Sequence, residues 1–297
     1  MRAAESTGYD ELSLLSLSSG DYSRIRDLVS SLMDHCESRQ VSVSLPSLRL
    51  DGFAEEIPRN LERVRGGGLT FAPEAGTERL RRAVNKAIPD ATILDTIRQA
   101  MTKHWESLKL YFMIGLPTET EEDIAGIGRL VGRIHGMLRG QGWRRGTIHV
   151  SIGTFSPKPH TPYQWCGQIS TAVCADRLRI LRSDLRRNGI KLSTNNPEPS
   201  LLEAILARGD IRLAGVIELA FRAGCRFDEW FECFRWDLWQ NAFRQMGLRP
   251  ESLAEKTYRR EDLLPWSVID IGVRPEYLWH EYRRTFEDRP SDHCGRD

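Results

Sequence analysis

The 297 residues are enough for one large domain or two moderate ones, and 40% hydrophobic with 28% charged side chains indicates a globular chain with a sizeable core. The 42 basic residues nearly balance the 41 acidic ones, so the net charge of +1 predicts no membrane partner and no clear nucleic-acid surface. No apolar run approaches the roughly 18 residues of a membrane-spanning helix, and no signal peptide is visible. We therefore expect a cytoplasmic protein.

Short, β-rich apolar runs alternate with helical patterns along the first 190 residues. Five runs predict strands, at residues 11–17, 41–45, 69–72, 108–114 and 148–154. Strands that alternate with helices at this spacing are typical of βα units and a parallel sheet. We therefore predict an α/β fold in which the five strands lie side by side in one curved parallel sheet.

Helical periodicity is clear in the segments 21–38, 123–139 and 171–188. Thr120 and Asp123 form a capping-box sequence before the second segment, and Gly189 is a suitable C-cap after the third. Residues 1–6 have the pattern of the last turn of a helix, which Gly8 would stop. That start predicts that an earlier βα unit is missing.

The pattern changes from residue 191 onward. Segment 195–199 predicts a turn-rich linker, after which Ser200 would cap a helix that Gly209 closes. Aromatic residues crowd the stretch 227–246, and we interpret them as core, with an exposed partner-binding face as the alternative. We therefore divide the chain into residues 1–190 and a mostly helical C-terminal extension, residues 191–297.

The six cysteines are spread along the chain and form no CxxC pair. Two pairs share an eight-residue step, which on a helix separates the thiols by about 12 Å. That separation is too long for one disulfide or one metal ion. We expect thiols without a metal in a reducing compartment.

Small, polar elements follow four of the predicted strands. In chain order they contain the candidate binding residues Ser18, Ser19, Gly20 and Asp21, then Glu74 and Gly76, then Ile114, Gly115 and Pro117, and finally Ser156 and Lys158. Barrel-like α/β enzymes bind their ligands at the carboxyl ends of the strands, so we expect these residues to lie together. The alternative is that these residues have structural roles only. Asp21 would then be an N-cap, Glu74 or Thr77 would cap the next helix, and 115–118 would be a loop without a ligand.

The charged and glycine-rich segments next to these elements allow two further interpretations. Arg79, Arg81, Arg82 and Lys86 would lie on one helix, as a solvated face or as anchors for a ligand carboxylate. Gly126, Gly128 and Gly132 lie inside a predicted helix rather than in a strand-to-helix turn, so they are not a dinucleotide-binding fingerprint.

Taken together, four stretches resemble the radical S-adenosylmethionine superfamily, and within it a branch that carries a cobalamin-binding domain upstream. They are GYDELSLLSLSSGDYS, LTFAPEAGTERLRRAVNK, LKLYFMIGLPTETEEDI and FSPKPHTPYQW, and the C-terminal LLEAILARGD and AGCRFDEW are similar to the same branch. The resemblance covers roughly residues 7 to 290. It implies a partial (β/α) barrel of the radical S-adenosylmethionine type that lacks its first βα unit.

The resemblance also implies roles for the candidate residues. Ser18, Ser19, Gly20 and Asp21 would stand where the superfamily holds the amino group of S-adenosylmethionine. Glu74 would bind the ribose, Ile114 and Gly115 would contact adenine through their backbone, and the loop from Ser156 to Pro162 would close the site.

One departure bears on activity. The superfamily holds a [4Fe–4S] cluster with a CxxxCxxC motif, and this sequence contains no such motif. The resemblance therefore implies a fragment that is inactive alone, with a separate N-terminal half carrying the cluster and cobalamin domains as its partner. The alternatives are a non-catalytic remnant or interaction protein, or a phosphate-binding α/β enzyme of another family. The sequence indicates no substrate.

Overall fold

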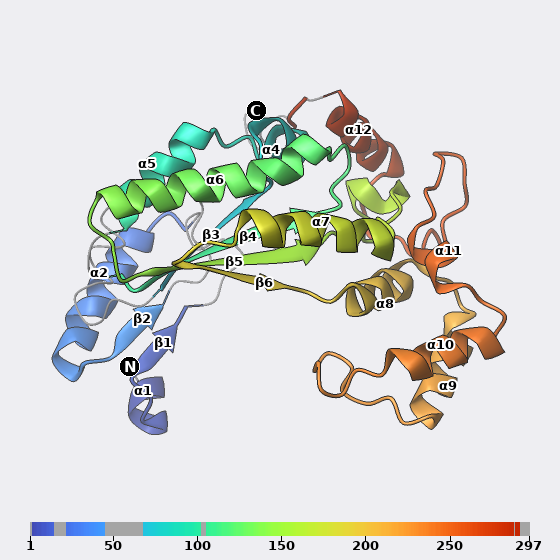
Figure 1. Cartoon of the computed structure of the whole chain (residues 1–297). Helices are drawn as coiled ribbons and strands as arrows, with labels where there is room; N and C mark the ends of the chain where they lie inside the picture. Colours follow the sequence, from blue (N-terminus) through green and yellow to red (C-terminus); the bar gives the residue numbers. More distant parts are fainter. Residues whose placement is uncertain (1, 15–21, 45–67, 102–104, 288, 292–297) are drawn as a thin grey trace.

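A four-stranded parallel sheet forms the centre of the protein (Figure 1). The structure is a computed structural model that describes residues 2–14, 22–44, 68–101, 105–287 and 289–291. The strands are β3 (Gly68–Glu74), β4 (Ser107–Ile114), β5 (Thr147–Thr154) and β6 (Ile190–Thr194), and they pair in that order. Each neighbouring pair is parallel, so all four carboxyl ends lie at one edge.

A second, smaller sheet holds the N-terminal strands. β1 (Glu11–Ser13) and β2 (Ser42–Ser44) pair in parallel with each other. The α/β class is therefore confirmed, whereas the prediction of one sheet containing all five runs is wrong for the residues described. The sequence interpretation also missed β6, which crosses the predicted boundary between residues 190 and 191. β6 has only five residues, in which half-buried and exposed side chains alternate, so it contains no continuous apolar run that would predict a strand.

Helices connect the strands. In the N-terminal part these are α1 (Arg2–Thr7), α2 (Ile25–Cys36), η2 (Glu37–Arg39), α4 (Glu78–Ala83), α5 (Asp90–Ala100), α6 (Glu121–Gly140), η3 (Pro162–Trp165) and α7 (Thr171–Asp184). The capping box at the start of α6 is confirmed, because the Asp123 carboxylate accepts from the Thr120 N–H at 2.8 Å. The three glycines rejected as a nucleotide fingerprint lie within this helix.

One face of the central sheet carries the main hydrophobic core. Side chains such as Phe71, Leu110 and Val150 are fully buried and belong to one cluster with apolar residues of α2, α5, α6 and α7. Figure 1 shows α5, α6 and α7 on the same side of the sheet. Every second side chain of β4 is buried on this face, as the two-residue period of a strand requires.

The opposite face of the sheet is polar and open to solvent in the described structure. Lys109, Tyr111, Lys191 and Ser193 are exposed, and His149 is half-buried. Parallel sheets are usually covered on both faces. An open, polar face is therefore a feature that needs a functional explanation.

The C-terminal extension is mostly helical, as predicted. It contains α8 (Pro197–Arg208), α9 (Leu213–Arg222), α10 (Trp236–Gln245), α11 (Pro250–Ala254) and α12 (Pro275–Phe286). The predicted linker and the Ser200 cap are wrong, because α8 begins at Pro197 and buries Ser200 within it. Proline suits the first turn of a helix because its missing N–H has no partner to lose there.

The aromatic stretch divides between core and surface. Trp239 and Phe243 are buried in a cluster with α8 and α9, as expected for core. Phe227, Trp230 and Phe231 are 74%, 66% and 73% exposed. The core interpretation is therefore confirmed for Trp239 and Phe243, whereas partner binding by the three exposed residues stays a prediction.

Within the described ranges, none of the helices combines the length and the apolar character that crossing a membrane requires.

Candidate functional site at the carboxyl edge of the sheet

Three loops come together where β3, β4 and β5 end. Glu74 closes β3, Ile114 closes β4, and the Phe155 N–H after β5 donates to the Ile114 carbonyl at 2.8 Å. The prediction that Glu74 and Gly115 lie at the same end of the sheet is confirmed. The first candidate group, Ser18, Ser19, Gly20 and Asp21, lies outside the described residues.

Glu74 has an unusual backbone conformation and a cationic partner. Its φ of 70° lies in the left-handed region, which non-glycine residues seldom adopt. Its carboxylate pairs with the Lys86 ammonium at 3.0 Å, and Lys86 also donates to the Ala72 carbonyl at 2.5 Å. Thr77 caps α4 by accepting from the Leu80 N–H at 3.2 Å. Glu74 is therefore not the helix cap, and its carboxylate is held by a lysine at the edge of the sheet.

Gly76 packs directly against the α6 backbone. A Cβ at this position would lie 2.2 Å from the Ile127 nitrogen and 2.4 Å from the Asp123 carbonyl oxygen. Gly126 makes the matching approach from the helix, where a Cβ would lie 2.7 Å from the Thr77 side chain. The structure thus gives Gly76 a packing role, and its contact with a ligand stays a prediction.

We expect Gly76→Ala to destabilise the fold by about 1–3 kcal/mol, because the added methyl meets backbone atoms that have no free space to move into. Urea unfolding measures the change. Gly136→Ala is the control, because a Cβ there meets nothing within 4 Å. An equal effect of the two substitutions would contradict the close packing of Gly76 on α6.

The loop after β4 is held by a buried acid. Both carboxylate oxygens of Glu119 accept from the Gly115 N–H at 3.0 Å, and the Arg177 guanidinium lies 2.5 Å from one of them. Burial raises the pKa of Glu119 to about 7, although the Gly115 hydrogen bond and Arg177 act in the opposite direction. Of the Gly115 backbone groups predicted to contact adenine, the N–H is thus already engaged. Pro117, two residues after Gly115, is also buried.

A second buried acid ties the loops after β3 and β4 to α6. Asp123 accepts from Thr77, Thr120 and Arg79, and Arg79 also donates to the Thr118 carbonyl at 2.8 Å. Burial alone would raise the pKa of Asp123, but these hydrogen bonds outweigh it and hold the pKa below its usual range. A carboxylate that stays ionised at neutral pH therefore organises this edge.

The basic residues predicted to lie on one helix do not all do so, because α4 ends at Ala83 and Lys86 follows it. Arg81 is 0% exposed and donates to the carbonyls of Ile88 and Ala75 at 2.7 and 3.0 Å. Arg79 pairs with Asp123, and Lys86 pairs with Glu74. A solvated position is therefore wrong for Arg81, whereas the anchoring of a ligand carboxylate by these residues stays a prediction.

The loop after β5 holds polar atoms without a protein partner. The Ser156 hydroxyl and His160 Nε2 are buried and make no hydrogen bond with the described residues. Buried polar atoms of this kind call for a specific explanation, such as a ligand or a water molecule. Lys158, in contrast, pairs with Glu203 of α8 at 2.5 Å and would have to leave it to reach a ligand.

Left-handed backbone recurs in all three loops. Glu74 is the last residue of β3, Thr118 and His160 lie in the segments after β4 and β5, and their φ angles are 70°, 67° and 56°. Each such residue costs on the order of 1–3 kcal/mol, and such strain clusters at binding and catalytic sites. The other described non-glycine residues with positive φ are Gln40, Asn85 and Phe227, which do not belong to this edge. The recurrence at three strand ends, together with the unpartnered polar atoms of Ser156 and His160, makes the carboxyl edge the candidate site.

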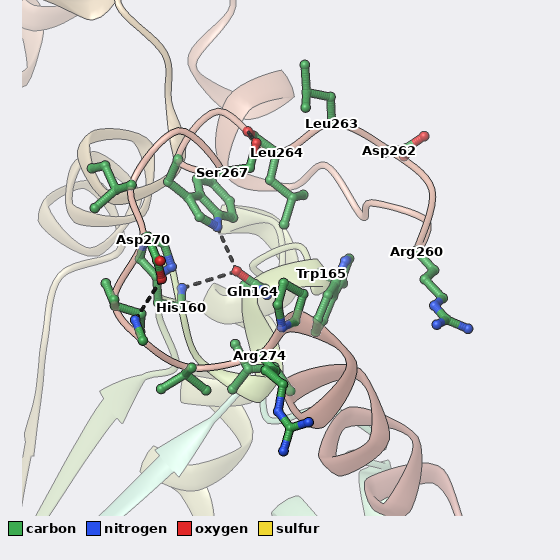
Figure 2. Close-up of a pocket in the computed structure, with 17 residues that line it drawn as sticks. His160, Gln164, Trp165, Arg260, Asp262, Leu263, Leu264, Ser267, Asp270 and Arg274 are labelled. Atoms are coloured by element: carbon green, nitrogen blue, oxygen red, sulfur yellow. Dashed lines mark hydrogen bonds between the residues drawn. The ribbon is translucent and has the colours of Figure 1, made fainter.

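A pocket of about 550 Å³ adjoins this edge (Figure 2). Its wall is formed by His160 and η3 on one side and by residues 260–278 of the extension on the other. Gln164 joins the two sides, because its side-chain oxygen accepts from the His160 N–H at 3.1 Å and from the Trp266 indole at 2.7 Å (Figure 2). The extension is therefore part of the surroundings of the site.

Sequence reasoning missed Glu119 and Asp123 as residues of this edge, whereas it had named Lys86 as a possible ligand anchor and the loop that contains His160 as part of the site. Glu119 precedes the Thr120 cap and Asp123 lies in the first turn of α6, and these positions in the sequence do not show which atoms the two carboxylates reach. No group of three His, Cys, Asp or Glu side chains able to hold a metal ion is found within the part of the chain that the structure describes.

Comparison with known proteins indicates ancestry but no activity. No protein-family model matches the chain. A curated relative, "Uncharacterized protein MJ0966" of Methanocaldococcus jannaschii, is 32% identical over 209 residues, which are 70% of this chain and 44% of the relative. The chain therefore spans less than half the length of the relative it matches.

Proposed function

We propose that the chain is part of a radical S-adenosylmethionine protein, and that the carboxyl edge of its sheet binds the nucleoside half of S-adenosylmethionine. The observation that carries the proposal is the recurrence of left-handed backbone in three successive strand-to-helix loops at one edge. The strand order supports a partial (β/α) barrel, because it runs from β3 to β6 without the reversal that marks a doubly wound sheet. The polar open face would then be the inner face of the barrel.

Each loop offers the nucleoside a different group. The Glu74 carboxylate would accept hydrogen bonds from the two ribose hydroxyls, and these would replace its present hydrogen bond from Lys86. Because the Gly115 N–H is bound to Glu119, the Gly115 carbonyl is the group left to accept from the adenine amino group. The unpartnered Ser156 hydroxyl supplies a further polar contact.

A [4Fe–4S] cluster does not fit the described residues. Iron–sulfur clusters need several converging thiolates. The five described cysteines are single thiols, and burial raises the pKa of Cys166 to about 11, which disfavours the thiolate. The proposed role of this chain is therefore to bind and orient the nucleoside, and the cluster and cobalamin domains would be supplied by a separate N-terminal half.

The second candidate function is that of an interaction protein that retains the barrel scaffold. The observation that favours it is the exposure of Phe227, Trp230 and Phe231 on the extension. Exposed aromatic groups of this size commonly mark contact surfaces.

Calorimetry with S-adenosylhomocysteine tests the nucleoside site. We expect the wild-type chain to bind with a Kd on the order of 0.1–1 mM, which is about 4–5.5 kcal/mol. Glu74→Ala should weaken binding at least about tenfold, because it removes charge-assisted hydrogen bonds to the ribose.

Lys86→Met is the matched control, because it keeps the carboxylate and removes its partner. We expect this variant to bind at least as tightly as the wild type. Equal binding by wild type and Glu74→Ala would show that the ribose assignment is wrong. Absence of binding by the wild type at millimolar ligand would favour the interaction protein.

A further inference from the structure

A row of three basic side chains crosses the open face of the central sheet. Strand pairing places Lys109 of β4 beside His149 of β5, and His149 beside Lys191 of β6. Both lysines are exposed, and His149 is half-buried. Neighbouring strands lie roughly 4.8 Å apart, so the row spans roughly 10 Å.

No carboxylate in the described structure forms an ion pair with this row. The Lys109 ammonium lies 4.8 Å from the centre of the Tyr111 ring, which is an uncharged partner. Glu74 is the one acidic residue in the four strands of this sheet, and it pairs with Lys86. The two lysines, on either side of His149, thus give this face positive charge without a carboxylate partner among the described residues. The row is therefore arranged so that an anion would stabilise it.

Hydroxyl donors surround the basic row. Thr70 pairs with Lys109 on β3, and the next row on the same face holds Tyr111, Ser151 and Ser193 side by side. Ammonium, imidazole and hydroxyl groups all donate hydrogen bonds, and a phosphate group accepts them from several directions. The chemistry of this face therefore suits a phosphate group better than a cation or an apolar ligand.

We propose that the row of Lys109, His149 and Lys191 binds the phosphate or diphosphate group of a small-molecule ligand. The row lies five residues before the end of β4, which is roughly 17 Å from the carboxyl edge. It is thus separate from the nucleoside site. A row spanning roughly 10 Å on a chain of net charge +1 accommodates one or two phosphates, whereas a nucleic-acid strand needs a longer basic surface.

Inorganic pyrophosphate is the probe for this site. Calorimetry and thermal unfolding at low salt compare the full wild-type chain with the double variant Lys109→Gln, Lys191→Gln. We expect pyrophosphate to raise the melting temperature of the wild type, and the double variant to bind at least about tenfold more weakly. Without pyrophosphate, the double variant should melt close to the wild type, because the substitutions break no ion pair within the described structure.

The control is Arg145→Gln, Arg186→Gln, which changes the net charge equally at exposed positions away from the row. It should bind pyrophosphate as the wild type does. The proposal would be overturned if the wild type did not bind pyrophosphate at 10 mM. It would also be overturned if the Kd of the double variant lay within twofold of the wild-type Kd. Tighter binding of a short RNA oligonucleotide than of pyrophosphate would also overturn it. Binding of S-adenosylhomocysteine is measured separately, so either proposal can fail without the other.

Discussion

Replacing Arg81 by Met should destabilise the protein by about 2–5 kcal/mol, because it leaves two buried carbonyl groups without a donor, while Asp90 keeps Arg133 as its partner. Arg81 pairs with Asp90 at the start of α5 and donates to the carbonyls of Ile88 and Ala75. One guanidinium thus joins the loop after β3, α4 and the start of α5. Methionine can fill the volume, but it satisfies none of these oxygens.

Urea unfolding measures this loss, as a lower midpoint at an unchanged slope. The control is Arg98→Met, because Arg98 and its partner Asp95 are 50% and 56% exposed. Exposed pairs of this kind contribute no more than about 1 kcal/mol. A loss below about 1 kcal/mol for Arg81→Met would show that the carbonyls find other donors and that Arg81 does not join the three elements.

The second large effect is a pH dependence of stability that comes from Glu119. Its pKa is raised from 4.5 in the unfolded chain to about 7 in the fold, chiefly by burial. The folded protein therefore binds this proton more tightly than the unfolded chain does. The resulting stabilisation is complete below pH 4.5 and is lost as the pH rises through 7. Between pH 5 and 8 the loss amounts to about 2–3 kcal/mol.

Glu119→Gln isolates this contribution, because the amide oxygen can still accept from the Gly115 N–H and carries no titratable proton. Urea unfolding of both proteins at pH 5 and pH 8 gives the comparison. We expect the free energy of unfolding of the wild type to fall by about 2–3 kcal/mol more than that of the variant. Parallel pH profiles would mean that Glu119 is ionised throughout and that its pairing with Arg177 outweighs its burial.

Local sequence patterns determined much of the scaffold of this protein. The apolar periodicity of 123–139 and the capping sequence at Thr120 predicted α6, since both signals lie within the helix itself. Parallel strands end at a common edge, so the positions of Glu74 and Gly115 followed from their places after two strands. The division of the N-terminal strands into a separate sheet did not follow, because strand pairing depends on contacts between distant segments.

The roles of the charged side chains were decided by the tertiary structure alone. Sequence reasoning expects arginine and lysine in solvent, yet Arg81 is fully buried and Lys86 holds Glu74. The backbone of Gly115 was expected to contact a ligand, yet its N–H is bound by Glu119. The basic row exists only because pairing brings Lys109, His149 and Lys191 together from three strands. Hydrogen bonds and charge pairs act over a few ångströms in space, and the order of residues along the chain does not set those distances until the elements have packed.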